Sequence, residues 1–240
     1  MGNIFTFREI TEKAELEKAF RMRYKVYSKC RMQSFLKKND YSIDIDHYDV
    51  HSRHYSLDCN DTNIGYLRVV LPKNEISQDS VLELAAKYEL FDDYQSYLTS
   101  DVAPYPFLKY KGVPSGYWNF YKNLILRNEK LAEASRLVLD PEYRTIRSSK
   151  FLIECAIVLY FLICDGIKHA LISCFADHAA FYHHYGFEEI EKCNGYKLPG
   201  IDKAPSFLTL SLSSIPVRNK SRFQNMANEF RTTGKIAMEI

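Results

Sequence analysis

Six charged side chains occupy positions where the surrounding pattern predicts burial. Arg23 and Arg68 each fall in a row of apolar residues, and a buried guanidinium needs an anionic partner. Arginines and acids are equal in number in this set, which is the balance that a shielded polar network requires. Such a network could move protons and hold a charged substrate, or it could be a purely structural cluster of ion pairs. The six residues are Arg23, Asp46, Asp49, Arg68, Glu133 and Arg136.

A helix and two strands position the arginines of the N-terminal half. Apolar residues recur at spacings of three and four over residues 11–28, which predicts a helix that is capped by Thr11 and carries Arg23 on its buried stripe. Residues 54–59 and 64–71 predict two strands around a turn. Alternation along the second strand places Arg68 on the same face as its apolar neighbours. Both arginines therefore point into the expected core.

The C-terminal half alternates strands and helices. Residues 133–139 predict a strand, residues 149–164 an apolar helix and residues 170–175 another strand. This order is a βαβ unit, so part of the sheet should be parallel. A short helix near 178–185 and a strand at 207–212 complete the pattern.

The segment between the two halves is rich in aromatic residues and poor in regular pattern. Prolines interrupt its many Tyr and Phe side chains over residues 73–130. Such a length between strands is typical of a lid or a binding insertion. We therefore expect one domain over residues 1–215 that carries this insertion, followed by a tail or surface helix over residues 216–240.

Composition and charge exclude some classes of protein. Charged residues make up 26% of the 240 residues, and the net charge of +2 gives no basis for nucleic-acid binding. The most apolar run, 155–164, is about half as long as a membrane span. The cysteines show no CxxC pair, and His47, His51 and His54 fit no strong zinc pattern. We expect a cytoplasmic protein with no transmembrane segment, no disulfide framework and no metal.

A signature near the C-terminal end resembles that of the GNAT-type N-acyltransferases. It is FYxxxGF, here FYHHYGF over residues 181–187. The resemblance implies an α/β (α+β) fold of three layers, with a central mixed, twisted sheet between helices. In that fold two central strands splay apart and the pantetheine arm of an acyl thioester lies between them. By the resemblance Tyr182 protonates the leaving thiolate, although plain packing would also account for a tyrosine there.

Four more motifs resemble, in order, those of the acyl-homoserine lactone (autoinducer) synthases and their relatives. They are RYKVY at 23–27, DHYD at 46–49, GYLR at 65–68 and EASR at 133–136. The relatives are the long-chain N-acyl amino acid synthases and the exosortase-associated acyltransferases. Residues 46–54 and 67–72 resemble the exosortase-associated acyltransferases most. Two departures count against lactone synthesis. The tryptophan that autoinducer synthases carry shortly after the first motif is missing, and Phe35 is the nearest aromatic residue. The 73–130 insertion is also longer than a short autoinducer synthase needs.

The resemblance implies a role for each charged residue. Glu133 is the general base that takes a proton from the acceptor's ammonium group, which Asp46 and Asp49 hold. The arginines order these acids or bind the acceptor's carboxylate, because a guanidinium fork matches a carboxylate. Arg136 is grouped with the catalytic residues, and the substrate-binding candidates are Arg23, Tyr27, Arg68, Ser135 and Val138.

The fold also implies a β-bulge in the strand that carries Glu133. Simple alternation puts Glu133 and Arg136 on opposite faces of that strand, and one extra residue would bring them together. The same bulge would point a backbone N–H at the thioester oxygen as an oxyanion donor.

The phosphate-binding loop of the fold departs from its usual glycine-rich pattern. It falls on residues 144–149, with Arg147 and Ser149 where glycines belong. Those glycines let backbone N–H groups approach a pyrophosphate at a helix N-terminus. The basic loop could instead contact a single phosphate or an acidic carrier protein, or it could be solvated and without a ligand. The donor-binding candidates are Arg144, Arg147, Ser148, Ser149 and Lys150.

These observations favour an N-acyltransferase without a permanently bound cofactor. It would move a medium or long acyl chain from acyl carrier protein, or from acyl-CoA, to the primary amine of a small acceptor such as an amino acid. The alternatives are an autoinducer synthase that uses S-adenosylmethionine and a CoA-dependent acetyltransferase. A non-catalytic protein that binds acyl thioesters is an alternative of another class. The sequence leaves the oligomeric state open.

Overall fold

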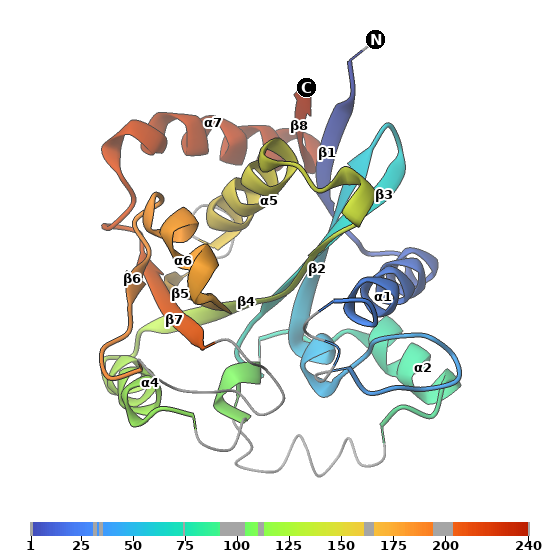
Figure 1. Cartoon of the computed structure of the whole chain (residues 1–240), viewed down its shortest axis with the longest axis horizontal. Coiled ribbons are helices and arrows are strands. Elements are labelled where there is room, and N and C mark those ends of the chain that lie inside the picture. The colour runs from blue at the N-terminus through green and yellow to red at the C-terminus, as the bar shows by residue number, and fades with distance from the viewer. Residues whose placement is uncertain are drawn as a thin grey trace.

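A central mixed sheet organises the chain. The computed structural model describes residues 2–30, 33, 36–73, 75–91, 104–109, 113–160, 166–193 and 204–239. Within these residues eight strands form one sheet in the order β6-β7-β5-β4-β3-β2-β1-β8 (Figure 1). The strands are β1 Ile4–Glu9, β2 Ser52–Cys59, β3 Thr62–Val70, β4 Lys130–Leu139, β5 Ile167–Phe175, β6 Glu188–Glu189, β7 Pro205–Ser211 and β8 Lys235–Glu239.

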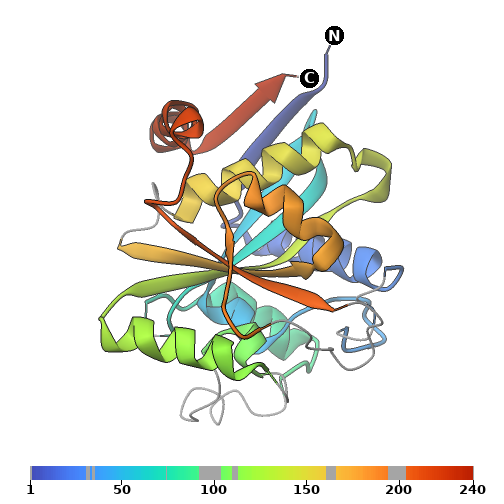
Figure 2. The same cartoon turned by 60° about the vertical axis from the view of Figure 1, so that its left-hand side comes forward.

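Helices cover both faces of the sheet. α5, α6 and α7 lie on one face, and α1, α2 and α4 lie on the other (Figures 1 and 2). This arrangement confirms the predicted three-layer fold. The helices are α1 Lys13–Tyr27, α2 Asp79–Lys87, α4 Ser115–Leu126, α5 Ile146–Val158, α6 Ala176–His183 and α7 Val217–Thr233, with short 3-10 turns η2 His47–His51, η3 Pro106–Lys109 and η4 Pro141–Tyr143. No helix in these described ranges is both long and apolar enough to cross a membrane.

The two central strands separate partway along their length. β4 and β5 are parallel and pair only from Lys130–Glu133 to Ile167–Leu171. Beyond this point β4 continues beside β3 as far as Leu139, whereas β5 continues beside β7 as far as Phe175. The predicted splay is therefore present, and it opens the middle of the sheet.

A β-bulge in β4 changes which side chains share a face. Tyr66 pairs with Val138 and Arg68 pairs with Ser135, so two residues of β4 stand opposite the single Leu67. Arg136 has a φ of 53°, an uncommon value for a residue other than glycine. The bulge puts Arg136 on the face of Ser135 and Glu133, as predicted.

Element boundaries differ from the sequence prediction where side chains cap the helices. α5 begins at Ile146 rather than at Ser149, because Thr145 and Ser148 form a reciprocal capping box. α1 follows Glu12, which makes no side-chain cap, so Thr11 does not have the predicted capping role. The predicted end of the apolar helix, 161–165, lies outside the described residues, as does Phe35.

The two ends of the chain meet in the sheet. β1 pairs with β2 on one side and with β8 on the other. The sequence prediction missed both end strands and assigned residues 216–240 to a tail or surface helix. In the structure that segment forms α7 followed by β8, and Ile236 of β8 is buried in the core.

The aromatic-rich insertion packs mainly on itself and on the sheet. Residues 73–130 contain α2, η3 and α4 among the described residues. Tyr105 and Tyr117 are buried with Phe207 of β7, and Trp118, Phe120 and Tyr121 pack against them. Gly116 permits this packing, because a Cβ atom there would lie 2.0 Å from the carbonyl oxygen of Glu191. Three other aromatics of the insertion, Tyr94, Tyr97 and Tyr110, lie outside the described residues.

Candidate active site

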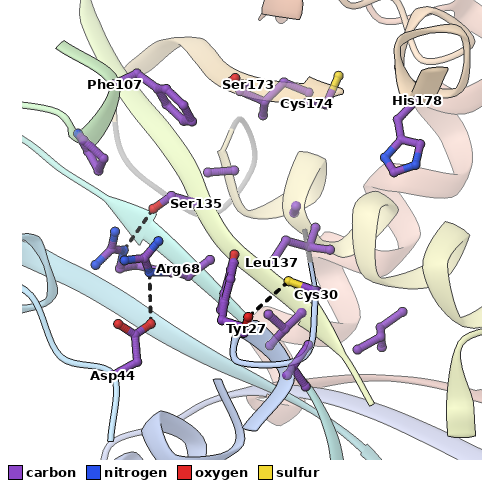
Figure 3. A pocket seen from close by; sticks show the side chains of 18 of the residues that line it. Tyr27, Cys30, Asp44, Arg68, Phe107, Ser135, Leu137, Ser173, Cys174 and His178 are labelled. Carbon is purple, nitrogen blue, oxygen red and sulfur yellow. Dashed lines mark hydrogen bonds and ion pairs between the residues drawn. The ribbon is translucent and has the colours of Figure 1, made fainter. Parts of the chain in front are cut away.

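A large cavity occupies the splay between β4 and β5. Its volume is about 1150 Å³, and its walls come from β4, β5, α5, α6, the end of α1 and the η2 and η3 segments. Figure 3 shows Arg68, Asp44 and Ser135 toward one end of this cavity and Cys174 and His178 toward the other. The cavity therefore connects the charged network on one face of the sheet with the α5–α6 side of the other face.

Arg23 lies at the buried centre of the charged network. Its side chain is 0% exposed, and its Nη1 donates to Asp49 Oδ1 at 2.7 Å. Its Nε and Nη2 donate to Asp44 Oδ2 at 3.0 and 2.8 Å. Because two buried carboxylates hold this guanidinium from two directions, its side chain is locked in place.

Arg68 and Arg136 complete the network at the cavity. Arg68 Nη1 donates to Asp49 Oδ1 at 2.9 Å and to Asp46 Oδ1 at 2.5 Å, and its Nε donates to Ser135 Oγ at 2.9 Å. Arg136 Nη2 lies 3.3 Å from Asp46 Oδ2, and its Nε lies 3.0 Å from Asp44 Oδ2. The network thus joins three arginines to three aspartates.

The η2 turn sets the positions of two of these aspartates. Asp46 N–H donates to Asp49 Oδ2 at 2.8 Å, and Tyr48 N–H donates to Asp46 Oδ1 at 3.0 Å. These bonds cap the turn from both sides, and the same two carboxylates also accept from Arg68 and Arg23. The spacing within DHYD is therefore a consequence of this cap.

His54 and Tyr66 form a second layer behind the network. Arg23 Nη1 donates to the Tyr66 hydroxyl at 3.1 Å, and His54 Nδ1 lies 2.6 Å from the same oxygen. His54 Nε2 lies 2.9 Å from the carbonyl oxygen of Asp49. Burial lowers the pKa of His54 to about 4, so the ring is neutral near pH 7.

The pKa values of Asp46 and Asp49 are lowered, whereas the pKa of Glu133 is raised. Burial by itself would raise the pKa of Asp46 and Asp49, but the neighbouring arginines outweigh it and hold both pKa values below the ordinary range. Burial raises the pKa of Glu133 to about 8, because the Phe107 N–H at 3.5 Å from Oε2 and the charge of Arg68 offset it only in part. Glu133 is therefore largely protonated at pH 7, but its pKa lies close enough to neutrality for its ionised fraction to accept a proton.

The cavity brings together most of the residues that the sequence indicated. The predicted site residues along its walls are Tyr27, Asp46, Arg68, Ser135, Arg136, Val138, Arg144, Ser149 and Tyr182. Asp46 is the network acid that reaches it most, with 25% of its side chain exposed. Glu133 is fully buried directly behind Phe107, which lines the cavity.

Four predictions about individual residues need correction. Arg23 and Asp49 are fully buried in ion pairs, so they order the network and do not reach a substrate in the cavity. Ser148 is buried, and its hydroxyl donates to the carbonyl oxygen of Tyr143 at 2.7 Å, so it caps α5 and is not a phosphate ligand. Glu133 and Arg136 share a face, but Arg136 pairs with aspartates and Glu133 with the Phe107 N–H.

Tyr182 lies on the opposite wall, on α6. Burial raises the pKa of its hydroxyl, so the phenol is protonated throughout the neutral range. Burial also raises the pKa of neighbouring Cys174 to about 12, which makes that thiol a poor nucleophile. Arg147 and Lys150 lie outside the cavity wall, at the start of α5.

Sequence reasoning missed three residues that complete the site. Asp44, His54 and Tyr66 each contact the network through a side chain. Asp44 stands in the acidic run before the DHYD motif, and Tyr66 shares an alternating row with Arg68, so these signals existed but did not single them out. Among the described residues, no group of three or more His, Cys, Asp or Glu side chains is placed to hold a metal ion.

Comparison with known proteins gives one family match and several structural ones. Residues 115–209 match the family model of the N-acyl amino acid synthase FeeM. No curated protein sequence matches the chain. The match covers the βαβ unit and the α6 region, where the FYxxxGF signature lies.

Solved structures share the fold at low sequence identity. FeeM, an N-acyl amino acid synthase from uncultured soil microbes, has a TM-score of 0.51 at 11% identity, over 90% of this chain and 97% of that chain. The CoA-dependent acyl-homoserine lactone synthase BjaI, solved with SAM and isopentyl-CoA, has a TM-score of 0.57 at 15% identity, over 93% and 90%. MesI, another such synthase, has a TM-score of 0.53 at 18% identity, over 92% and 95%. The family match and this shared fold together support an acyltransferase enzyme with N-acyltransferase activity, similar to the FeeM synthases.

Proposed function

We propose that this protein transfers a medium or long acyl chain from a carrier-bound thioester to the primary amine of a small acceptor that bears a carboxylate. One observation carries the proposal. The cavity in the splay of β4 and β5 is large enough for an acyl chain and its thioester, and it ends at the Asp46–Arg68–Arg136 part of the network. The thioester and the amine can therefore meet beside Ser135.

The start of α5 favours a carrier protein over free CoA as the donor. The Thr145 side chain accepts the Ser148 N–H at 3.1 Å, so the cap already uses one of the N–H groups that a pyrophosphate would need. Arg147 stands where the fold usually has a glycine. Ile146 is 82% exposed between basic residues, which suits an acidic surface with some apolar character. A single phosphate on such a carrier would meet Arg144, which lines the cavity.

Charge along the cavity favours an acceptor with a carboxylate. Among the described lining residues, five are basic and three are acidic. Asp46 is the partly exposed acid and is the candidate to hold the ammonium group of the acceptor. The cations near it can bind the acceptor's carboxylate. The basic lining residues are Lys29, Lys37, Arg68, Arg136 and Arg144, and the acidic ones are Asp44, Asp46 and Asp177.

The chemistry that we propose is a direct acyl transfer. The ammonium gives up one proton through water to ionised Glu133, and the free amine nitrogen then attacks the thioester carbon. The carbonyl oxygen becomes an oxyanion, which a backbone N–H of the bulge would stabilise. When the C–S bond breaks, Tyr182 gives its proton to the thiolate, and the second proton that the attacking nitrogen must lose passes through water to the Tyr182 phenolate, so amide and thiol are released. This step needs no cofactor beyond the donor thioester.

The acyl chain would lie along the apolar part of the cavity. Ile153, Ile157 and Ile172 line the α5 side, and Leu90 and Phe107 line the opposite end. The aromatic cluster of α4 packs behind this wall, so the insertion contributes Phe91 and Phe107 to the lining rather than most of its aromatics. We place the protein in the reducing cytoplasm, where these donors would be available, and the described cysteines form no disulfide.

Mass spectrometry of lipid extracts tests the proposal. The protein and its Glu133→Gln variant would be expressed in a simple bacterial host, and the extracts compared. We expect N-acyl amino acids that are absent from the variant, and their masses would give both the acyl chain and the acceptor. Acyl-homoserine lactones would instead identify an autoinducer synthase. Purified protein that binds acyl-carrier protein without releasing thiol would indicate a non-catalytic binder and contradict the proposal.

A further inference from the structure

The insertion supplies the polar groups that surround the Glu133 carboxyl group. Phe107 of η3 donates its backbone N–H to Glu133 Oε2 at 3.5 Å, which is a long hydrogen bond. Tyr105, at the start of the same segment, donates its hydroxyl to the carbonyl oxygen of Leu131 at 2.8 Å and so ties η3 to β4. The strand that carries Glu133 therefore relies on residues 104–109 for part of the environment of its carboxyl group.

Tyr117 of α4 completes that environment. Its side chain is 1% exposed, and its ring packs against Phe207 with centroids 5.2 Å apart. Its hydroxyl and Glu133 Oε1 are both buried, and neither has a hydrogen-bond partner among the described residues. The two groups nevertheless influence each other, since Tyr117 lowers the pKa of Glu133 and Glu133 raises that of Tyr117. Geometry places them in one buried group, because Phe207 also packs against Phe107 with ring centroids 5.9 Å apart, and the Phe107 N–H reaches Glu133 Oε2.

Two buried polar groups without partners are costly, and the cost rises when the carboxyl ionises. A phenol can rotate its O–H toward a carboxylate, and a hydrogen bond to a charged acceptor is stronger than one to a neutral acid. Phe107 alone gives the carboxylate one weak donor. Tyr117 is placed to give it the second, while its ring stays fixed by Phe207.

We propose that Tyr117 is a positioning residue that donates its hydroxyl to the ionised carboxylate of Glu133 and so holds the base ready for proton transfer. The inference rests on the proposed function of Glu133 as the base. The charged and titratable groups that act on this carboxyl group from the surrounding elements are Arg68 of β3, Asp46 beside η2, Tyr105 beside η3 and Tyr117 of α4.

A direct titration of Glu133 tests the inference without any substrate. The carboxyl carbons of glutamate would be labelled with 13C, and the Glu133 signal assigned from its loss in Glu133→Gln. Tyr117→Phe keeps the buried ring but removes the donor, and we expect the ionisation constant of Glu133 to fall about tenfold, so that its pKa rises. Tyr121→Phe is the matched control on the same helix, and it should leave the Glu133 titration unchanged. An unchanged titration in Tyr117→Phe would overturn the inference.

A second measurement distinguishes positioning from a merely structural role. With donor and acceptor, the acid limb of the pH profile of thiol release should move to higher pH in Tyr117→Phe, whereas a structural defect would lower the rate equally at all pH values. Should Tyr117→Phe fail to fold, fluorotyrosine at position 117 is a stronger donor and should lower the pKa of Glu133 instead. If wild-type protein releases no thiol with any donor, the proposed function fails, and the titration still decides the role of Tyr117.

Discussion

At the scale of single residues, this site combines ionised acids with one neutral acid. Asp46 and Asp49 keep their charge because arginines lie within hydrogen-bond distance. Glu133 lies on the same face of the sheet but lacks a direct guanidinium partner among the described residues, so burial raises its pKa to about 8. Carboxyl groups of one site are thus held in different ionisation states because their neighbours differ, and the proposed mechanism gives the aspartates an electrostatic role and Glu133 a role in proton transfer.

The raised pKa predicts how stability depends on pH. The pKa of Glu133 is about 8 in the folded protein and about 4.3 in the unfolded chain. The folded protein therefore keeps a proton that the unfolded chain has lost, and the contribution of Glu133 to the unfolding free energy falls as the pH rises from about 4.3 to 8. Glu133→Gln removes this dependence. We expect the variant to gain stability relative to wild type across that window, by at most about 5 kcal/mol.

Urea unfolding at pH 5, 7 and 9 measures this difference. The two proteins should be similar at pH 5 and should separate at pH 7 and further at pH 9. A constant difference at all three pH values would show that Glu133 is not buried in the way that the structure indicates.

At the scale of elements, the α5 N-terminus and the β4 bulge decide what the cavity can bind. The bulge places Arg136 on the cavity face, where it meets Asp44 and Asp46. The capping box of Thr145 and Ser148 starts α5 one turn earlier than the apolar pattern indicates, which puts Arg147 in the first turn. The start of the helix therefore carries basic side chains, and in the proposed function these face the donor in place of a glycine-lined backbone.

Charge reversal at the start of α5 tests the choice of donor. Arg147→Glu combined with Lys150→Glu should raise the KM for acyl-carrier protein by about tenfold or more, because rim charges steer an acidic partner. The KM for a short acyl-pantetheine should stay the same, since neither residue lines the cavity. Lys18→Glu with Lys220→Glu changes the net charge equally at exposed positions elsewhere and is the control. An equal rise in KM in the control pair would contradict a specific docking surface.

At the scale of the whole molecule, the sheet joins the two ends of the chain. β8 adds to the outer edge of β1, and Ala237 N–H donates to Glu229 Oε1 of α7 at 2.8 Å. Ile236 is buried in the same core as Phe7 and Phe223. The segment after residue 216 therefore contributes one face of α7 and Ile236 of β8 to the core.

Ile236→Ala should test that contribution. Removing a buried isoleucine side chain leaves a cavity, and we expect a loss of about 2–4 kcal/mol in the unfolding free energy. The turnover of the folded variant, measured well below its melting temperature, should equal that of wild type because Ile236 is remote from the splay. A loss under about 0.5 kcal/mol, typical of a surface position, would mean that β8 packs only loosely.

Local patterns in the sequence were sufficient for much of the framework. The periodicity of residues 11–28, the alternation around Arg68 and the βαβ order after Glu133 depend on neighbours in the chain, and the structure confirms each of these elements. β1 and β8 escaped prediction because these short strands gain their stability from partners far along the chain: β1 pairs with β2 and β8, and β8 pairs with β1.

By itself, the sequence determined which residues carry charge, their order in motifs and the elements that hold them. Only the tertiary structure decided which of them reach the cavity. Arg23 and Asp49 bear the same charges as Arg136 and Asp46. They are nevertheless fully buried in an ion pair with each other, because the packing of α1 and η2 turns both side chains inward. Burial raises the pKa of Glu133, and Phe107 and Tyr117, which come from an insertion that no motif marks, offset part of that rise. The burial of a side chain and its interaction partners depend on segments distant in the sequence. Burial and partners in turn decide whether the side chain is ionised and whether it lines the cavity.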